Sequence, residues 1–193
     1  MQRLRLIAGP NGSGKTTLTR ALINNSVPLG QYVNPDDIAK HISFGESVDL
    51  VKAQLPENTT KLPQSYEISD EVFQYIEALM AQKIAIGLRH DWIDANLSLT
   101  YESVMSHPSH LDFVETAADA GFQPYLYYIC TSDPRINQER VRQRVDSGGH
   151  DVPSDKIVSR YHNSLSLLYD MVMKCREPTF LIIPAGPIAI SPR

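Results

Sequence analysis

The sequence predicts an α/β protein in which helices cover both faces of a parallel β-sheet. Short apolar segments alternate with helical segments along the chain, as in the strand–helix units of parallel sheets. A glycine-rich segment at residues 9–16 separates the first apolar segment from the first helical one. The chain has 193 residues, a length that suits a single domain with a full core.

The N-terminal part contains two predicted strand–helix pairs. Leu4 to Ala8 form a short, largely apolar strand, and residues 17–23 form a helix that ends near Asn24. Tyr32 and Val33 form a short second strand. Asn34 is expected to cap the next helix, with Pro35 in its first turn. Residues 43–68 are polar and include two prolines, so they are expected to form an irregular excursion from the core.

The remaining part continues the alternation of helices and strands. Apolar residues at helical spacing predict an amphipathic helix from Asp70 to Arg89. The expected elements after it are a strand at 97–101, a helix at 111–120, a buried strand at 123–130, a helix from Pro134 to about Ser147, a helix at 154–174 capped by Ser154, and a strand at 180–183.

Composition excludes several classes of protein. The net charge of −4 argues against a strongly basic nucleic-acid-binding surface, so no nucleic acid partner is expected. No run approaches the roughly 18 apolar residues of a membrane span, and no secretory signal is visible. Cys130 and Cys175 are the only cysteines, and no disulfide framework is expected. These features predict a cytoplasmic enzyme without a membrane partner.

Residues 9–16 match the phosphate-loop pattern G-x-x-x-x-G-K-[ST] at every position. The motif lies between a predicted strand and a helix, which is the context in which it binds nucleotide. Backbone N–H groups and the helix N-terminus would surround the phosphates, Lys15 would contact the β- and γ-phosphates, and Thr16 would hold Mg²⁺. The alternative is a glycine-rich turn without a ligand. The expected nucleotide-binding residues are Gly9, Asn11, Gly12, Ser13, Gly14, Lys15, Thr16 and Thr17.

Carboxylates follow two of the predicted strands, where parallel sheets bind ligands. A kinase needs a carboxylate near the γ-phosphate to orient or deprotonate the acceptor hydroxyl. Asp36 is the candidate base, and its alternative role is a first-turn acid favoured by the helix dipole. Glu102 would bind the hydroxyls of the acceptor. The alternative for Glu102 is a solvent-exposed acid at the end of a strand.

A basic segment at about 140–160 is a candidate lid. Arg140 and Arg144 are four residues apart and therefore share a helix face, whereas Arg142 points elsewhere. Cations there, with Arg160, would stabilise the charge of a transferring phosphoryl group, and Gly148-Gly149 would allow closure. The alternative is that Gly148 simply ends a helix and the arginines form a solvated face.

Three functional classes remain open from these residues. The first is a small-molecule kinase, the second is a switch that hydrolyses ATP, and the third is a degenerate nucleotide-binding scaffold. The acid at Asp36 together with a basic lid favours the kinase. Signatures of other nucleotide machines are absent, including Leu-Ser-Gly-Gly-Gln, Asn-Lys-x-Asp and a strand that ends in Asp-Glu.

Several motifs occur in the order found in the zeta toxin-type small kinases, which the chain resembles over residues 4 to about 170. They are residues 9–17, Asn34-Pro35-Asp36, residues 101–106, and the segment Arg140 to Tyr161 with its Gly-Gly-His-Asp-Val-Pro block at 148–153. The resemblance implies a P-loop kinase fold. It also implies phosphorylation of UDP-N-acetylglucosamine on the sugar, with ATP and Mg²⁺, and inhibition by a small helical antitoxin.

The resemblance also implies roles for particular residues. Asp36 matches the base of the family, and Glu102 matches its substrate-binding acid. Arg144, His150 and Arg160 fall in the region that clamps the ATP phosphates, so His150 joins the expected nucleotide-binding residues and Lys15, Asp36, Arg144 and Arg160 form the expected catalytic set.

The chain departs from the family pattern in two places. Residues 102–106 read Glu-Ser-Val-Met-Ser where the family has Glu-Thr-x-Leu-Ser. The last strand lacks the Asp-Asn-Ser that often ends it in relatives. A DNA encoding residues 176–185 can read Arg-Ala-Tyr-Phe-Phe-Asp-Asn-Ser-Gly in a shifted frame, which gives the hypothesis that the tail is a frameshifted remnant. Sequencing the gene around codon 176 in a related strain tests it.

Overall fold

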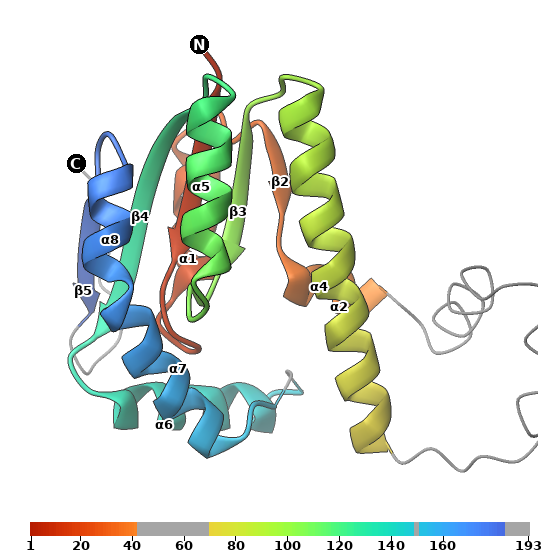
Figure 1. Ribbon diagram of the computed structural model, residues 1–193. Coiled ribbons are helices and arrows are strands. Elements are labelled where there is room, and N and C mark those ends of the chain that lie inside the picture. Colours follow the sequence, from red (N-terminus) through yellow and green to blue (C-terminus); the bar gives the residue numbers. More distant parts are fainter. Residues whose placement is uncertain (42–69, 149–150, 184–193) are drawn as a thin grey trace, which may run out of the picture. The chain divides into compact units, whose positions relative to one another are not determined.

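The computed structural model describes residues 1–41, 70–148 and 151–183, and its central element is a five-stranded sheet (Figure 1). The strand order is β2-β3-β1-β4-β5. β1 pairs in parallel with both β3 and β4, and β4 pairs in parallel with β5. The strands are β1 (Arg3–Ala8), β2 (Gln31–Val33), β3 (Leu99–Ser103), β4 (Gln123–Thr131) and β5 (Thr179–Ile183).

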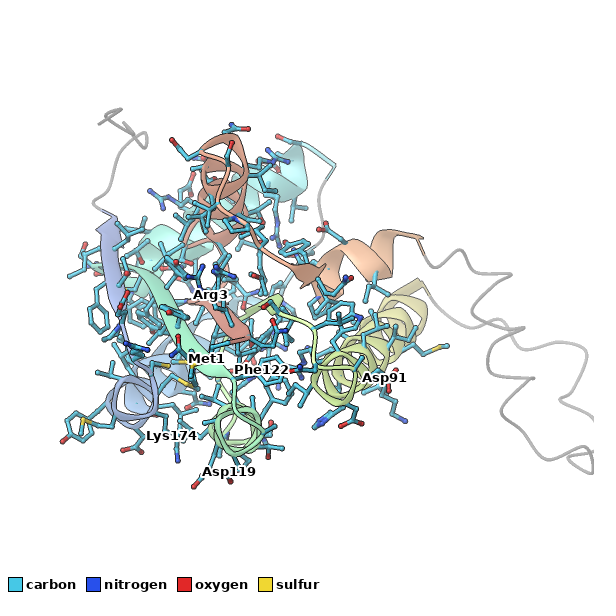
Figure 2. All side chains as sticks on the ribbon, turned by 90° about the horizontal axis from the view of Figure 1, so that it is seen from above. Met1, Arg3, Asp91, Asp119, Phe122 and Lys174 are labelled. Carbon is cyan, nitrogen blue, oxygen red and sulfur yellow. The ribbon has the colours of Figure 1, made fainter. Side chains whose placement is uncertain are left out.

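Helices cover both faces of this sheet. Figure 2 shows Asp119 and Lys174, near the ends of α5 and α8, on one side of the sheet, with α1 on the other. The predicted α/β fold with a parallel sheet is therefore confirmed. The faces are covered by α1 (Lys15–Asn24), α5 (Ser109–Asp119) and α8 (Leu168–Lys174). Figure 1 shows α6 (Pro134–Asp146) and α7 (Ser154–Ser166) beyond the carboxyl end of β4.

The core lies on the central strands. Leu4, Leu6 and Ile7 of β1 are almost fully buried, as are Leu99 of β3 and Leu126 of β4. A strand covered on both faces needs apolar side chains at successive positions rather than at alternate ones. The largely apolar run at the start of the sequence is explained by this position in the middle of the sheet.

The predicted helix at 154–174 is wrong in two respects. It is interrupted at Leu167 into α7 and α8, and the two helices have different partners: α7 packs against α6, whereas α8 packs against α5 and β4. Ser154 is the first residue of α7 rather than its cap, which is Pro153. The Ser154 hydroxyl instead accepts a hydrogen bond from Nε2 of Gln138 at 2.6 Å.

The chain divides into two compact units. One comprises residues 1–32 and 92–193 and is called the sheet unit below; the other comprises residues 33–91. The second contains α2 (Pro35–His41) and most of α4 (Asp70–Asp94), which extends past the predicted end at Arg89. Ala39 and Ala81 pack together there, flanked by Ile38 and Met80. The predicted excursion at 43–68 lies outside the described residues.

Across the described ranges, no helix combines the length and the apolar character needed to cross a membrane.

Candidate active site

The phosphate-loop sequence follows the carboxyl end of the central strand. β1 has β3 on one side and β4 on the other. From β1 the chain runs first to β2 at one edge of the sheet, and the later connections to β3, β4 and β5 run in the opposite direction. Ligands of open α/β sheets bind at such a reversal point. The N–H of Gly9 donates to the carbonyl of Ser103 at 3.2 Å, so the loop leaves directly from the end of the β1–β3 ladder.

Gly9 makes a contact that no other residue permits. Its φ is +148°, and a Cβ placed on it would lie 1.9 Å from the carbonyl oxygen of Ile129 and 2.9 Å from Oγ of Ser13. Glycine is therefore required, because any side chain would collide with the backbone of β4. This close approach determines where the loop turns away from the sheet.

The loop ends at the exposed N-terminus of α1. Gly14 is the N-cap residue of this helix, no side chain caps the helix, and no acidic residue lies in its first turn. The first backbone N–H groups of a helix have no partners within it, and they carry the positive end of the helix dipole. The N-terminus of α1 can therefore bind an anion such as a phosphate.

Lys15 lies across the loop that precedes it. Its Nζ donates to the carbonyl of Gly9 at 2.8 Å and to that of Pro10 at 3.1 Å. The ammonium group is thus held beside the turn of the loop. A bound phosphate would offer it an anionic acceptor, and hydrogen bonds to charged acceptors are stronger than those to carbonyls.

Two buried polar atoms of the loop make no hydrogen bond. They are Oδ1 of Asn11 and Oγ of Ser13, and Ser13 is 0% exposed. A buried polar group without a partner costs about 1–3 kcal/mol, so its presence in a native loop calls for an explanation. A phosphate group fits the hydroxyl of Ser13, the N–H groups of α1 and the ammonium of Lys15. Thr16 and Thr17 are exposed at the start of α1.

Glu102 is buried near the carboxyl end of β3. It is 3% exposed, and its Oε1 accepts hydrogen bonds from Oγ1 of Thr19 at 2.5 Å and from the hydroxyl of Tyr32 at 2.7 Å. The alternative of a solvent-exposed acid is therefore wrong for Glu102. The carboxylate instead joins α1, β2 and β3 at the carboxyl ends of the strands, where the phosphate loop also begins.

The arginines of the predicted lid divide into two groups. Arg142 is exposed and forms an ion pair with Glu139 at 2.8 Å. Arg140 and Arg144 are half-buried on another face of α6, and Arg160 is half-buried on α7. The burial of Arg140 and Arg144 argues against a plain solvated face. His150 lies outside the described residues.

Asp36 lies in the second unit, in the first turn of α2. The side chain of Asn34 accepts a hydrogen bond from the N–H of Asp36 at 3.0 Å, which agrees with the predicted cap. Asp36 itself is exposed, whereas the neighbouring Asp37 is half-buried. No hydrogen bond within the described residues engages the carboxylate of Asp36, so that group is available to a ligand.

The start of α6 is fixed by a side-chain cap. Asp133 accepts a hydrogen bond from the N–H of Arg135 at 2.8 Å and pairs with its guanidinium at 2.5 Å. The hydrogen bonds from Arg135 lower the pKa of Asp133 to about 2. The carboxylate therefore stays charged at neutral pH and stabilises the helix N-terminus.

Sequence reasoning missed two polar clusters beside the loop. Asn137 on α6 is fully buried and donates from Nδ2 to the carbonyl of Asn11 at 2.5 Å. Oγ of Ser103 lies 2.8 Å from Nε2 of His110, and Ser103 is the residue whose carbonyl holds Gly9. The spacing of Asn137, Val141 and Arg144 along one helix face was the signal for the first cluster. The second had no signal in the spacing.

Comparisons with known proteins agree with this arrangement. A family model described as "AAA domain" (AAA_33) matches residues 4–162. An uncharacterized protein of Haemophilus influenzae is 31% identical over 153 residues, which are 79% of this chain and 88% of the relative.

Solved structures share the fold at low sequence identity. A structure of the PezAT toxin-antitoxin system of Streptococcus pneumoniae has a TM-score of 0.60 and 14% identity, over 94% of this chain and 69% of that one. A proposed kinase from Chloroflexus aurantiacus has a TM-score of 0.55 and 15% identity, over 95% and 85%. The AvrRxo1-ORF1:-ORF2 complex with ATP has a TM-score of 0.57 and 16% identity, over 90% and 50%.

The family match covers most of the chain, from β1 through the phosphate loop to α7. The phosphate loop and the parallel sheet imply nucleotide binding. The chain belongs to the AAA_33 family of AAA domains and has a P-loop kinase-like fold.

Proposed function

We propose that the protein is a kinase of the zeta toxin type, which uses ATP and Mg²⁺ to phosphorylate an alcohol group of a small molecule. The observation that carries this proposal is the loop itself. Lys15, the uncapped N-terminus of α1 and the unpartnered hydroxyl of Ser13 lie within one short segment at the carboxyl end of β1. Together they offer a charge, a dipole and a hydrogen-bond donor to one phosphate chain.

Binding of ATP would replace contacts that the loop now makes with itself. The Nζ of Lys15 would exchange the carbonyls of Gly9 and Pro10 for β- and γ-phosphate oxygens. The hydroxyl of Ser13 would gain an acceptor. The exposed hydroxyl of Thr16 would hold the Mg²⁺, whose chemistry is to neutralise charge on the phosphates.

The acceptor alcohol would be handled by two carboxylates. Asp36 has an unengaged carboxylate, so it can accept the proton of the acceptor hydroxyl. The alcohol oxygen then forms a bond to the γ-phosphorus while the bond to the β–γ bridging oxygen breaks, and ADP leaves. Glu102 would bind neighbouring hydroxyls of the acceptor. Arg144 and Arg160 would stabilise the charge spread over the transferring oxygens.

The acceptor class follows from the resemblance to zeta toxins. We propose a nucleotide sugar such as UDP-N-acetylglucosamine, with a small antitoxin protein as the partner. The fold likeness to a toxin-antitoxin protein supports this proposal. The fold likeness to a complex with ATP supports ATP as the donor. On this proposal the whole chain of 193 residues is one kinase-like domain in the cytoplasm.

The test is a transfer assay with γ-labelled ATP, Mg²⁺ and a panel of nucleotide sugars, with water as the only acceptor in a parallel reaction. Label in a phosphosugar supports the kinase. Label only in inorganic phosphate would replace it with an ATP-hydrolysing switch. ATP binding without release or transfer of label would identify a degenerate nucleotide-binding scaffold.

A further inference from the structure

We propose that Asn137 is a positioning residue that links the phosphate loop to the arginines of α6 and α7. The proposal concerns four residues of the sheet unit, called the loop–lid relay here: Asn11, Asn137, Thr131 and Tyr161. It rests on the proposed function in taking ATP as the ligand of the loop and, for the tyrosine variants alone, in using the rate of phosphoryl transfer as the readout.

The first step of the relay joins the loop to α6. Nδ2 of Asn137 donates to the carbonyl of Asn11 at 2.5 Å, and Asn137 is 0% exposed. The two segments also touch through their backbones, because a Cβ on Gly12 would lie 2.9 Å from the carbonyl oxygen of Asn137. Gly12 has a φ of +73°, so a side chain there is disfavoured by conformation as well as by space. The loop therefore lies directly against the first turns of α6.

The second step fixes the orientation of the Asn137 amide. Its Oδ1 accepts a short hydrogen bond from the hydroxyl of Thr131, the last residue of β4. A reversed amide would place its oxygen against the carbonyl of Asn11 and its NH₂ group at the Thr131 hydroxyl. That hydroxyl also lies 3.1 Å from the carbonyl of Asp133, its other acceptor. The observed orientation gives both ends of the amide a partner.

The third step reaches α7. The hydroxyl of Tyr161 donates to the carbonyl of Thr131 at 2.8 Å, and Tyr161 is 6% exposed. Burial raises the pKa of Tyr161, so the hydroxyl keeps its proton at neutral pH. Arg160 precedes Tyr161 in the chain. The relay thus holds the helix that carries Arg160 to the same strand end that holds Asn137.

The geometry of α6 explains what the relay positions. Asn137, Val141 and Arg144 are spaced at four and three residues, and Arg140 lies three residues after Asn137. Residues at these spacings share one face of a helix. Asn137 and Val141 are buried, so this face is turned inward, and Arg140 and Arg144 are half-buried along it. The Asn137–Asn11 bond therefore sets the position of these arginines relative to the phosphate loop.

The loop and the arginines are expected to respond together. A phosphate that reshapes the loop at Asn11 and Gly12 shifts the partner of Asn137, and the shift is transmitted to α6. Conversely, a relay that is broken leaves the loop without the bond that keeps the Asn11 carbonyl turned toward α6. Nucleotide affinity and transfer rate should therefore both depend on buried groups that contact no nucleotide.

Two buried tyrosines form a matched pair for testing this. The hydroxyl of Tyr161 bonds to Thr131 in the relay, whereas the hydroxyl of Tyr128 bonds to Oγ of Ser164 at 3.0 Å outside it. Both tyrosines are buried, and each bond joins β4 to α7. Tyr161→Phe and Tyr128→Phe should lower the melting temperature to a similar extent. Only Tyr161→Phe should change the rate of transfer, by threefold or more.

Thr131 gives the sharper variants. Thr131→Val keeps the shape and removes the donor to Asn137, and we expect at least a tenfold loss of MgATP affinity by calorimetry. Thr131→Ser keeps the hydroxyl and should remain within about threefold of the natural chain. In an Asn137→Ala background, Thr131→Val should cause no further loss of affinity, because residues that act through one another are not additive.

The outcomes separate this proposal from the proposed function. Calorimetry with MgATP needs no acceptor. If the protein binds ATP but transfers no label, the proposed kinase activity is overturned, and the MgATP affinities of the variants still test the relay. The relay is overturned if Thr131→Val or Asn137→Ala binds MgATP as the natural chain does. It is equally overturned if Tyr128→Phe lowers the transfer rate as much as Tyr161→Phe, because the effect then follows stability alone.

Discussion

The hydroxyl of Thr19 lies 2.5 Å from Oε1 of Glu102, and this contact joins the helix that carries Lys15 to β3. Thr19 is one helical turn beyond Lys15, and its hydroxyl also lies 3.2 Å from the carbonyl of Lys15. The buried carboxylate therefore supports the turn of α1 that follows the phosphate loop. A variant that removes the charge of Glu102 and keeps its shape distinguishes this structural role from binding of the acceptor.

The first prediction concerns the charge of Glu102. Glu102→Gln keeps an oxygen that can accept from both Thr19 and Tyr32, so the free energy of unfolding should change by about 1 kcal/mol or less. If the carboxylate binds acceptor hydroxyls, KM for the acceptor should rise about tenfold, since a charge-assisted hydrogen bond is roughly twice as strong as a neutral one. MgATP affinity should not change. Steady-state kinetics and thermal unfolding measure the three quantities.

Tyr32→Phe is the control for that variant. It removes one donor to Glu102 and leaves the charge, so it should cost about 1 kcal/mol of stability without changing KM for the acceptor. A Glu102→Gln protein with normal kinetics would leave Glu102 as a structural acid that joins α1, β2 and β3.

The second prediction concerns Lys15. Lys15→Ala should abolish turnover and weaken ATP binding, because no other side chain of the loop places a full charge on the phosphates. The fold should remain intact, although loss of the ammonium leaves the buried carbonyls of Gly9 and Pro10 without that donor and should lower the free energy of unfolding by about 1–3 kcal/mol. Calorimetry and circular dichroism test the two parts. Arg20→Ala removes an exposed cation from the same helix and should bind ATP normally.

The third prediction concerns the arginines of the lid. Arg144→Ala and Arg160→Ala should each slow transfer by roughly 10²-fold, the scale on which a cationic contact to a transferring phosphoryl group acts. The melting temperature should change little. Arg142→Ala is the matched control, because Arg142 is exposed and pairs with Glu139 on the same helix. Equal rates in all three variants would favour a purely structural role for these arginines.

The fourth prediction concerns the two cysteines. Burial raises the pKa of Cys175 to about 12, and it also raises the pKa of Cys130. The thiolate is the reactive form, so at pH 7–8 both groups are protonated almost entirely. The folded protein should react with a disulfide reagent far more slowly than the protein in denaturant. The thiolate fraction of Cys175, and with it the rate of reaction, should go on rising with pH up to about 12 in the folded protein, where an ordinary thiol levels off at a lower pH. Rapid labelling of the folded protein at pH 8 would contradict this account.

The sequence predicted the architecture well because strong local signals agreed with one another. Each of three segments favours a single local structure: the apolar run before Gly9, the glycines of the phosphate loop, and Asp133-Pro134 at the start of α6. The expected strand at 97–101 begins instead at Leu99. The apolar pattern includes Leu97, which lies exposed before the strand.

The parts that sequence reasoning missed depend on contacts between distant segments. The interruption at Leu167 separates two helices with different packing partners, and neither partner is visible in the helical periodicity of 154–174. The relay joins Asn11 to Asn137, which are 126 residues apart. The only local signal for the buried Asn137 is the helix face that it shares with Val141, and its polarity alone predicts exposure. Such residues become apparent only when the fold places their partners.

The last prediction concerns Asp36 as the base for the acceptor. Asp36→Asn keeps the size of the side chain and the hydrogen bond from its N–H to Asn34, and it removes only the charge. Transfer should fall by roughly 10²-fold or more, the scale of general-base loss. On the proposed role, ATP binding should be unharmed, because removing a negative charge adds no repulsion toward the phosphates.

A purely structural Asp36 predicts the opposite pattern. The first-turn carboxylate would then stabilise α2 through the helix dipole, worth about 0.3–1 kcal/mol, and activity would be retained. Asp37→Asn is the internal control, because adjacent residues of a helix face about 100° apart. Asp37 is half-buried where Asp36 is exposed, so the two variants test different environments with the same chemical change. A dead Asp37→Asn enzyme beside an active Asp36→Asn enzyme would transfer the role of base to Asp37. If both variants are slow, the rate of transfer should be measured against pH in each one. Loss of the general base removes the acidic limb of this profile, whereas loss of a charge that only orients the substrate leaves it in place.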